Sequence, residues 1–155
     1  MSANGRHLAH LNVARMRAPM DSYEMAGFRA ELDAINALAD RAPGFIWRMV
    51  DEDPNDPGLL SLGPLMLVNM SLWRDAGALA DYVYRSDHAR VFKRRGEWFL
   101  PGEGATSVLW WVESGRIPTL TEAVERLRLL REVGASPDAF GFRKLYGADA
   151  TTGTV

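Results

Sequence analysis

The chain has 155 residues, the size of one domain, and its 47% hydrophobic and 25% charged residues are ordinary for a globular protein. A net charge of −2 without a basic block argues against nucleic acid as a partner, and the absence of cysteine excludes disulfides and thiolate metal ligands. The N-terminus lacks the apolar core of a signal peptide and no apolar run approaches the roughly 20 residues that span a bilayer, so we expect a cytoplasmic protein without a membrane partner.

Periodicity and turn residues predict nine elements. In chain order these are a strand over 7–16, a helix over 22–41, strands over 45–51 and 65–73, helices over 75–84 and 86–98, a strand over 105–112, a helix over 119–133 and a strand over 139–145. The stretch 51–58, with two prolines and four acids, is expected to be a solvated loop.

Capping residues mark the helix ends. The expected N-terminal caps are Asp21 with Glu24, Asp75, Ser86, and Thr119 with Glu122. Pro43-Gly44 and Gly134 are expected to end the first and last helices.

The element order indicates an α+β fold with helices on one face of a largely antiparallel sheet, the ferredoxin-like βαββαβ arrangement with additions. We expect a single domain over 1–155, with an ordered core over about 7–145 and a flexible tail over 147–155.

One face of this sheet carries unusual polar residues. One side of strand 65–73 is wholly apolar, whereas the other carries Asn69, Ser71 and Trp73, and strand 7–16 repeats the mixture with His10 and Asn12. A second copy packed face to face would enclose these groups in a cavity filled by water or ligand. The alternative is that Asn69 and Ser71 satisfy neighbouring backbone groups or face solvent in a monomer.

Trp110 and Trp111 are adjacent on strand 105–112 and must point to opposite faces, so one of them is expected at the cavity.

Helix 86–98 has a stripe that combines apolar and charged side chains. His88, Phe92, Arg95 and Phe99 recur at helical spacing, with Trp98 beside them. Buried Arg95 would need a partner, either an acid of the fold or an anionic ligand. The helix dipole favours neutral His88, which can act as a base or hydrogen-bond donor or be purely structural.

Other motifs are missing. The three histidines show no metal-ligand spacing, and no phosphate-binding or nucleophile-elbow motif occurs, so we expect no metal.

Seven segments together resemble the bacterial family DUF3291. They are HLAHLNVAR at 7–15, INALA at 35–39, PGFIWR at 43–48, VNMSLW at 68–73, YRSDH at 84–88, RGEWF at 95–99 and LWWV at 109–112. The resemblance covers about residues 7–145 and implies a dimeric α+β barrel. Arg116 stands where that family commonly has a histidine.

That superfamily includes cofactor-free monooxygenases of antibiotic biosynthesis, polyketide cyclases, isomerases and haem proteins. Its quinone-forming monooxygenases resemble this chain in having an Asn and a Trp four apart on a strand, as Asn69 and Trp73 are, followed by an Arg, for which Arg95 is the candidate.

The leading hypothesis is a cofactor-free tailoring enzyme of secondary metabolism, a monooxygenase or a cyclase/isomerase, that binds an aromatic or polyketide-like substrate. Asn69 would bind a carbonyl or oxyanion, Arg95 would hold negative charge, and His88 or His10 would move the proton. The substrate-binding candidates are Trp73, Trp98, His10, Asn12, Trp110, Trp111, Tyr84 and Arg48. All these groups are expected to converge on one enclosed space. The alternatives are a metabolite-binding or sensing protein and a haem protein ligated by His88 or His10.

Overall fold

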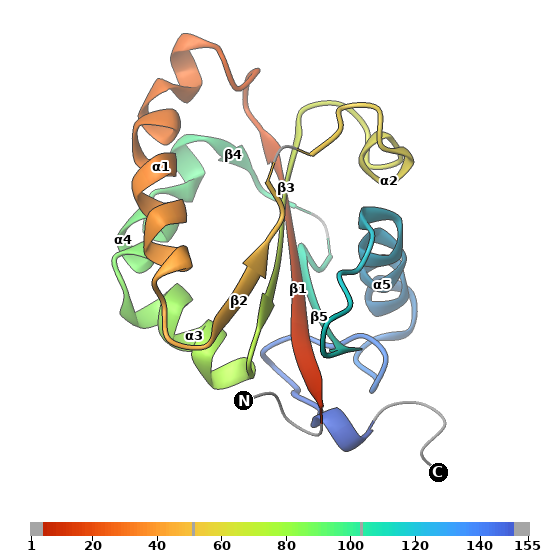
Figure 1. The fold of residues 1–155 in the computed structure, drawn as a ribbon. Helices are drawn as coiled ribbons and strands as arrows, with labels where there is room; N and C mark the ends of the chain where they lie inside the picture. Colours follow the sequence, from red (N-terminus) through yellow and green to blue (C-terminus); the bar gives the residue numbers. More distant parts are fainter. Residues whose placement is uncertain (1–4, 51, 103, 151–155) are drawn as a thin grey trace.

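The computed structural model describes residues 5–50, 52–102 and 104–150. Its elements are β1 (Arg6–Met16), α1 (Ala26–Asp40), β2 (Phe45–Arg48), α2 (Pro57–Leu60), β3 (Met66–Trp73), α3 (Ala76–Arg85), α4 (His88–Lys93), β4 (Phe99–Leu100), β5 (Ser107–Glu113) and α5 (Leu120–Val133) (Figure 1). Within these residues, no helix is both long and apolar enough to cross a bilayer.

The five strands form one antiparallel sheet. β1 is central, with β3 and then β2 on one edge, and β5 and β4 on the other. The sheet curls into a half-barrel (Figure 1), which confirms the expected α+β class. Cross-strand register places Leu8 beside Trp73 and Trp111, and Asn12 beside Asn69 and Ser107.

One face of the sheet is apolar and is covered by α5. The side chains of Leu11, Met70 and Val108 pack there against Leu127, and none of the four is more than 3% exposed. Removing these side chains from water supplies the main stabilisation of this layer. This is the face that the sequence predicted to pack against helices.

The opposite face, called the polar face below, is approached by α1, α3 and α4 (Figure 1). At one end Leu8 and Trp73 pack against Leu79 of α3, and at the other Leu67 packs with Phe28 of α1. The expectation that helices cover one face only, leaving the other for a second copy, is therefore corrected: helices of the same chain lie on both faces.

The expected capping pair at the first helix is wrong. α1 begins at Ala26 after a 3-10 turn over Tyr23–Met25, and neither turn nor helix has a side-chain cap. Arg29 instead binds this region by donating from Nη1 to the carbonyl of Ser22 at 2.6 Å. The expected caps Asp75 and Thr119 are confirmed, since each accepts a hydrogen bond from a first-turn N–H of its helix.

The helix expected over 86–98 is much shorter. α4 ends at Lys93, and Arg95–Glu97 forms a 3-10 turn closed by an ion pair of 2.9 Å between Arg94 and Glu97. Gly96 disfavours continuation of the helix because a glycine loses more backbone conformational entropy on folding than any other residue. Trp98 is 3% exposed, and its burial beside α1 directs the chain away from the axis of α4.

Three further segments differ from expectation. The loop expected over 51–58 ends in α2, capped by Asp56, with residue 51 outside the described residues. The strand expected over 139–145 is reduced to isolated bridges, one of which joins Phe140 to Leu109. In the expected tail, Ala148–Ala150 forms a 3-10 turn with Ala148 buried, and 151–155 lie outside the described residues.

Candidate functional site

Two polar rows cross the polar face, between its two apolar ends. Asn69, Asn12 and Ser107 lie on neighbouring strands in one row. Ser71 and His10 lie opposite each other in the next row. Because directly opposite residues of an antiparallel sheet share a face, these side chains point to the same side. The polar groups that the sequence placed on two strands are thus brought together.

His88, at the start of α4, is half-buried against the same face. Its Nδ1 lies 3.2 Å from the carbonyl oxygen of Val83. A carbonyl oxygen only accepts, so in the neutral ring Nδ1 carries the hydrogen and Nε2 keeps the lone pair. Burial lowers the pKa of His88, although the bond to Val83 acts in the opposite direction. Neutral His88 is therefore a base with a defined acceptor atom.

His10 is the second imidazole of this face. Burial, together with the nearby charge of His88, lowers the pKa of His10 from 6.5 to about 4. Its ring contacts that of Phe142 edge-on, with 6.5 Å between the centroids. The pKa of each histidine lies below the usual 6.5, so both rings are neutral at pH 7.

A chain of ring contacts connects the two histidines. From His10 it passes through Phe142, Tyr84 and Phe92 to His88, and then through Tyr82 to Trp73. Each neighbouring pair has centroids between 4.8 and 6.5 Å apart. Such a wall offers aromatic surface beside the polar rows, which is suited to a planar ligand.

Arg48 and Tyr82 form one corner of this region. Arg48 lies opposite Ser71 and donates from Nε to the carboxylate of Asp40 at 2.7 Å. The Tyr82 hydroxyl donates to the carbonyl of Ile35 at 3.2 Å, and burial raises its pKa to about 12. Both side chains are thus hydrogen-bonded to residues of α1. They position the aromatic wall and do not change protonation state near pH 7.

Asn69 and Arg95 are exposed in the single chain, so its own helices do not enclose them. Arg95 does not lie on a buried helical stripe because α4 ends before it. Its guanidinium instead stacks over Phe92, 4.1 Å from the ring centroid, and donates to the Phe92 carbonyl at 2.9 Å. It therefore borders the aromatic wall near His88 and remains open to solvent.

The tryptophans divide between core and polar face. Trp110 faces α5, where its Nε1 donates to Glu122 at 3.1 Å, and Trp98 is buried against Phe28, so both are core residues and not ligand contacts. Trp111 is the one on the polar face, and its Nε1 donates to the carbonyl of Tyr146. Trp73 is 1% exposed and packs on the buried side of the aromatic wall.

Arg116, which replaces a histidine of the resembled family, has a structural contact. It forms two hydrogen bonds with Glu122, of 2.9 and 2.8 Å, and these hold the pKa of Glu122 below its usual value. Since Glu122 also accepts from Trp110, this pair lies on the α5 side and is separate from the polar face.

The sequence analysis missed Tyr82, Phe142 and Ser107 as members of this site. Tyr82 follows Leu79 at helical spacing on α3, so the pattern alone indicated only a core position. Phe142 reaches the site from irregular backbone that the sequence predicted to be a strand. Neither position carries a signal that separates it from ordinary packing.

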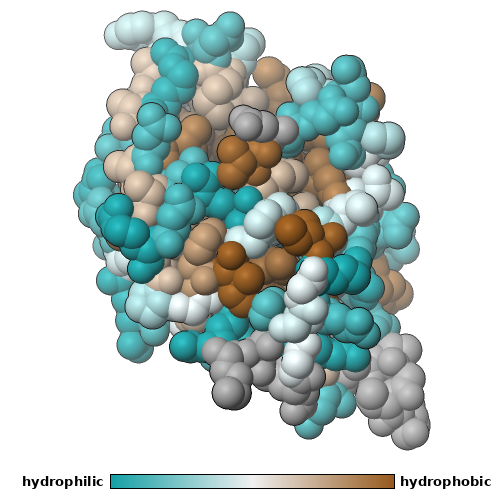
Figure 2. Space-filling model, in the orientation of Figure 1, coloured by the Kyte–Doolittle hydropathy of each residue, from teal (hydrophilic) through white to brown (hydrophobic). Residues whose placement is uncertain are grey.

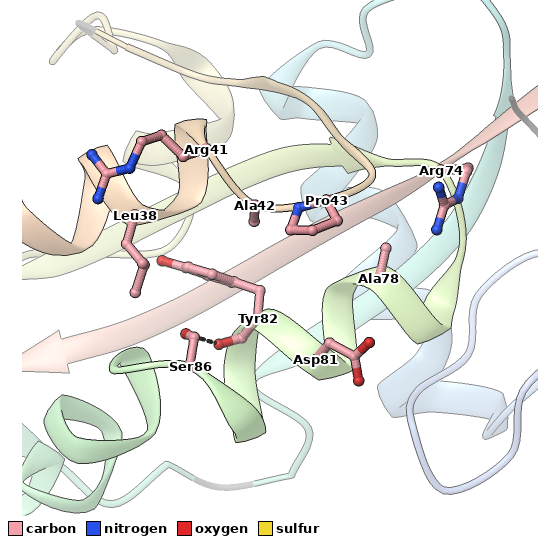
Figure 3. A pocket seen from close by; sticks show the side chains of 9 residues that line it. All are labelled: Leu38, Arg41, Ala42, Pro43, Arg74, Ala78, Asp81, Tyr82 and Ser86. Atoms are coloured by element: carbon pink, nitrogen blue, oxygen red, sulfur yellow. Dashed lines mark hydrogen bonds between the residues drawn. The ribbon is translucent and has the colours of Figure 1, made fainter.

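Two hollows of the described part of the chain lie away from His10 and His88. One, of about 320 Å³, lies between α1 and α3 (Figure 3), and the other, of about 330 Å³, lies beside α2. The polar face is open to solvent at Asn69 and partly covered at His10 and His88.

Haem does not fit the residues present. The ring of His88 has Tyr82 at 4.8 Å and Phe92 at 6.2 Å, its Nδ1 is held by the Val83 carbonyl, and neither histidine borders either of these two hollows. In the described ranges, no group of three or more acidic or histidine side chains is arranged to hold a metal ion.

These features define an α+β half-barrel protein with a polar, histidine-bearing sheet face. The chain belongs to the family described as Domain of unknown function (DUF3291), whose model matches residues 7–154 and confirms the resemblance. Comparison with curated proteins gave no match.

Among solved structures, the chain is similar to the NE2512 protein of unknown function from Nitrosomonas europaea, with 12% identity, a TM-score of 0.48 and coverage of 74% of this chain and 97% of that one. It is also similar to PA3566 from Pseudomonas aeruginosa, with 18% identity, a TM-score of 0.48 and coverage of 76% and 98%.

Proposed function

We propose that the protein is a small-molecule enzyme that binds an aromatic or polyketide-like compound on its polar face and acts on it by proton transfer without a cofactor. The observation that carries the proposal is the pair of neutral imidazoles, His10 and His88, beside an amide row and an aromatic wall. Perturbed, neighbouring titratable groups next to ligand-binding surface are characteristic of catalytic sites.

In the proposed reaction, Nε2 of His88 removes a proton from an acidic C–H or phenolic O–H of the substrate. The electron pair left behind becomes an enolate or phenolate, whose oxygen accepts hydrogen bonds from the amides of Asn69 and Asn12. Because burial disfavours the imidazolium form of His88, the base suits acidic substrates and readily returns its proton to the product.

The remaining residues would bind the substrate body. Tyr84 and Phe92 provide ring surface at the exposed side of the wall, with Trp73 and Trp111 behind it. Arg95, stacked on Phe92, would meet a negatively charged substituent at the rim, and Arg48 would hold the corner near Ser71.

Anthrone is a suitable probe because it has three rings and an acidic C–H group. Oxygenase chemistry would convert one anthrone and one O2 into one anthraquinone and one water, with the substrate carbanion as reductant. Oxygen uptake and anthraquinone absorbance measure this reaction. Without oxygen uptake, proton transfer from carbon to oxygen would give the tautomer anthranol, which would indicate isomerase chemistry.

The variants His88→Gln and Asn69→Ala separate binding from turnover. We expect turnover to fall by about 100-fold or more in each, typical of a lost base or oxyanion donor, with anthrone binding changed much less. Lys93→Gln, on an exposed position of α4, is the matched control. Wild-type turnover in both variants would refute the proposal.

A binding or sensing protein is the second candidate, and the exposure of Asn69 and Arg95 favours it. In that case the wild type binds anthrone without converting it, and Asn69→Ala and Arg95→Gln weaken binding directly.

We also propose a homodimer, as the superfamily resemblance implies, and a cytoplasmic location. β2 is an edge strand; Ile46 within it and Val50 just after it are 38% and 58% exposed. Figure 2 shows apolar surface along the middle of this view. Unpaired strand edges and apolar surface favour association. Light scattering that reports twice the chain mass in the wild type, and less in Ile46→Lys, would support the dimer, whereas a monomeric wild type would refute it.

A further inference from the structure

The hollow between the C-terminal end of α1 and helix α3 lies outside the proposed catalytic groups (Figure 3). Its volume of about 320 Å³ is at the small end of the range for small-molecule sites. Leu38, Pro43 and the ring of Tyr82 provide apolar surface, and Figure 3 shows Tyr82 beneath Leu38 and Pro43. The space suits a molecule with a single ring or a short branched chain.

Two arginines border this hollow, and both have unused donors. Arg41 follows Asp40, but both oxygens of that carboxylate are bound by Arg48, at 2.7 and 3.3 Å. The charge of Arg41 helps to lower the pKa of Asp40, but the hydrogen bonds to that carboxylate come from Arg48, so the Arg41 donors are left for another anion. Arg74 uses only Nε, which donates to Asp75 at 3.2 Å, so its terminal nitrogens are free to bind an anion.

Asp81 is the acid among the lining residues, and it is exposed and lies 3.5 Å from Arg85. Asp75 and Asp40 lie next to the two arginines. Arg74 is paired with Asp75, Arg48 with Asp40 and Arg85 with Asp81. The charge of Arg41 is therefore in excess at this hollow. A neutral or cationic ligand would leave this excess positive charge uncompensated, whereas an anion would compensate it.

We propose that this hollow is a second binding site, which takes a small organic carboxylate whose apolar body packs on Leu38, Pro43 and Tyr82. The carboxylate binds the arginines at the rim, Arg41 from the end of α1 and Arg74 from the turn before α3. Figure 3 shows them on opposite sides of Pro43, so each can bind a carboxylate on its own side and a dicarboxylate can bind both.

The site shares one wall with the polar face. Tyr82 borders the hollow, and its ring also stacks on Trp73 at 5.2 Å and contacts His88 at 4.8 Å. A ligand in the hollow therefore contacts the ring that supports His88, while its own binding groups lie on a different surface.

The test is an NMR titration of the full chain with phenylacetate, with phenylacetamide as a neutral probe of the same shape. We expect phenylacetate to shift the signals of Leu38, Arg41, Arg74 and Tyr82, and to bind at least several-fold more tightly than the amide. Equal affinities for the two probes, or shifts confined to other surfaces, would overturn the proposal.

Charge variants sharpen this test. Arg41→Gln and Arg74→Gln should each weaken phenylacetate binding about two- to fivefold, the usual effect of one exposed charge pair. Asp81→Asn should strengthen it by a similar factor. Arg128→Gln makes the same charge change on exposed α5 surface and should leave binding unaltered. Unchanged affinity in both hollow arginine variants would also refute the site.

The catalytic role of the polar face and the second binding site can be refuted independently of each other. Asn69→Ala should retain phenylacetate binding even where it abolishes anthrone turnover, because Asn69 does not border the hollow. Loss of phenylacetate binding in Asn69→Ala would show that the probe occupies the polar face, and would refute the second site.

Discussion

His10 should make the stability of the protein depend on pH. Its pKa is about 4 in the folded chain and 6.5 in an exposed reference state, so the unfolded chain binds a proton more readily than the folded one. The free energy of unfolding is therefore fully retained above pH 6.5, falls between pH 6.5 and 4, and levels off below pH 4.

The size of this effect follows from the shift. Each pKa unit corresponds to about 1.4 kcal/mol, so lowering the pH from 7.5 to 4.5 should remove about 2.5 kcal/mol through His10 alone. Burial is the main cause of the shift, and the charge of His88 is the smaller one. The variant His10→Gln cannot titrate, so it lacks this loss.

The assay is urea unfolding followed by tryptophan fluorescence at pH 7.5, 6.0, 5.0 and 4.5, for the wild type and His10→Gln. Carboxylates titrate in both proteins, so the difference between the two curves isolates His10. In His88→Gln the dependence on His10 should persist, with its NMR-measured pKa moved slightly upward. Identical pH dependence in the wild type and His10→Gln would refute the buried, neutral imidazole.

Three further substitutions test the fold, all by urea unfolding. Leu127→Ala removes a fully buried side chain between α5 and the sheet and should cost about 2–5 kcal/mol, whereas Val133→Ala, at a 65% exposed position, should cost under about 1 kcal/mol; similar losses would contradict the assigned core. Thr119→Ala removes the hydroxyl that accepts the first-turn N–H of α5 and should cost about 1 kcal/mol, with serine restoring it. Gly44→Ala should be strongly destabilising because φ is +83° and the new Cβ would lie 2.5 Å from an α3 side chain, whereas Gly96→Ala meets nothing and should be tolerated; equal tolerance would disprove the turn geometry.

Local patterns determined most of the elements from the sequence. Alternation identified β1 and β3, because side chains of a strand point alternately to two faces whatever lies beyond them. Thr119 and Gly134 marked the ends of α5, because their bonds and backbone angles involve only neighbouring residues.

The tertiary structure decided what covers each face and where α4 ends. The stripe through Arg95 satisfied helical spacing, but burial of Trp98 against Phe28 outweighs the weak preference of a short helix to continue through Gly96. Likewise, the composition of the polar face indicated a ligand or a second copy, while α1, α3 and α4 of the same chain in fact lie over it. The grouping of His10, His88, Tyr82 and Phe142 depends on contacts between segments far apart in the chain, and no local pattern encodes such contacts.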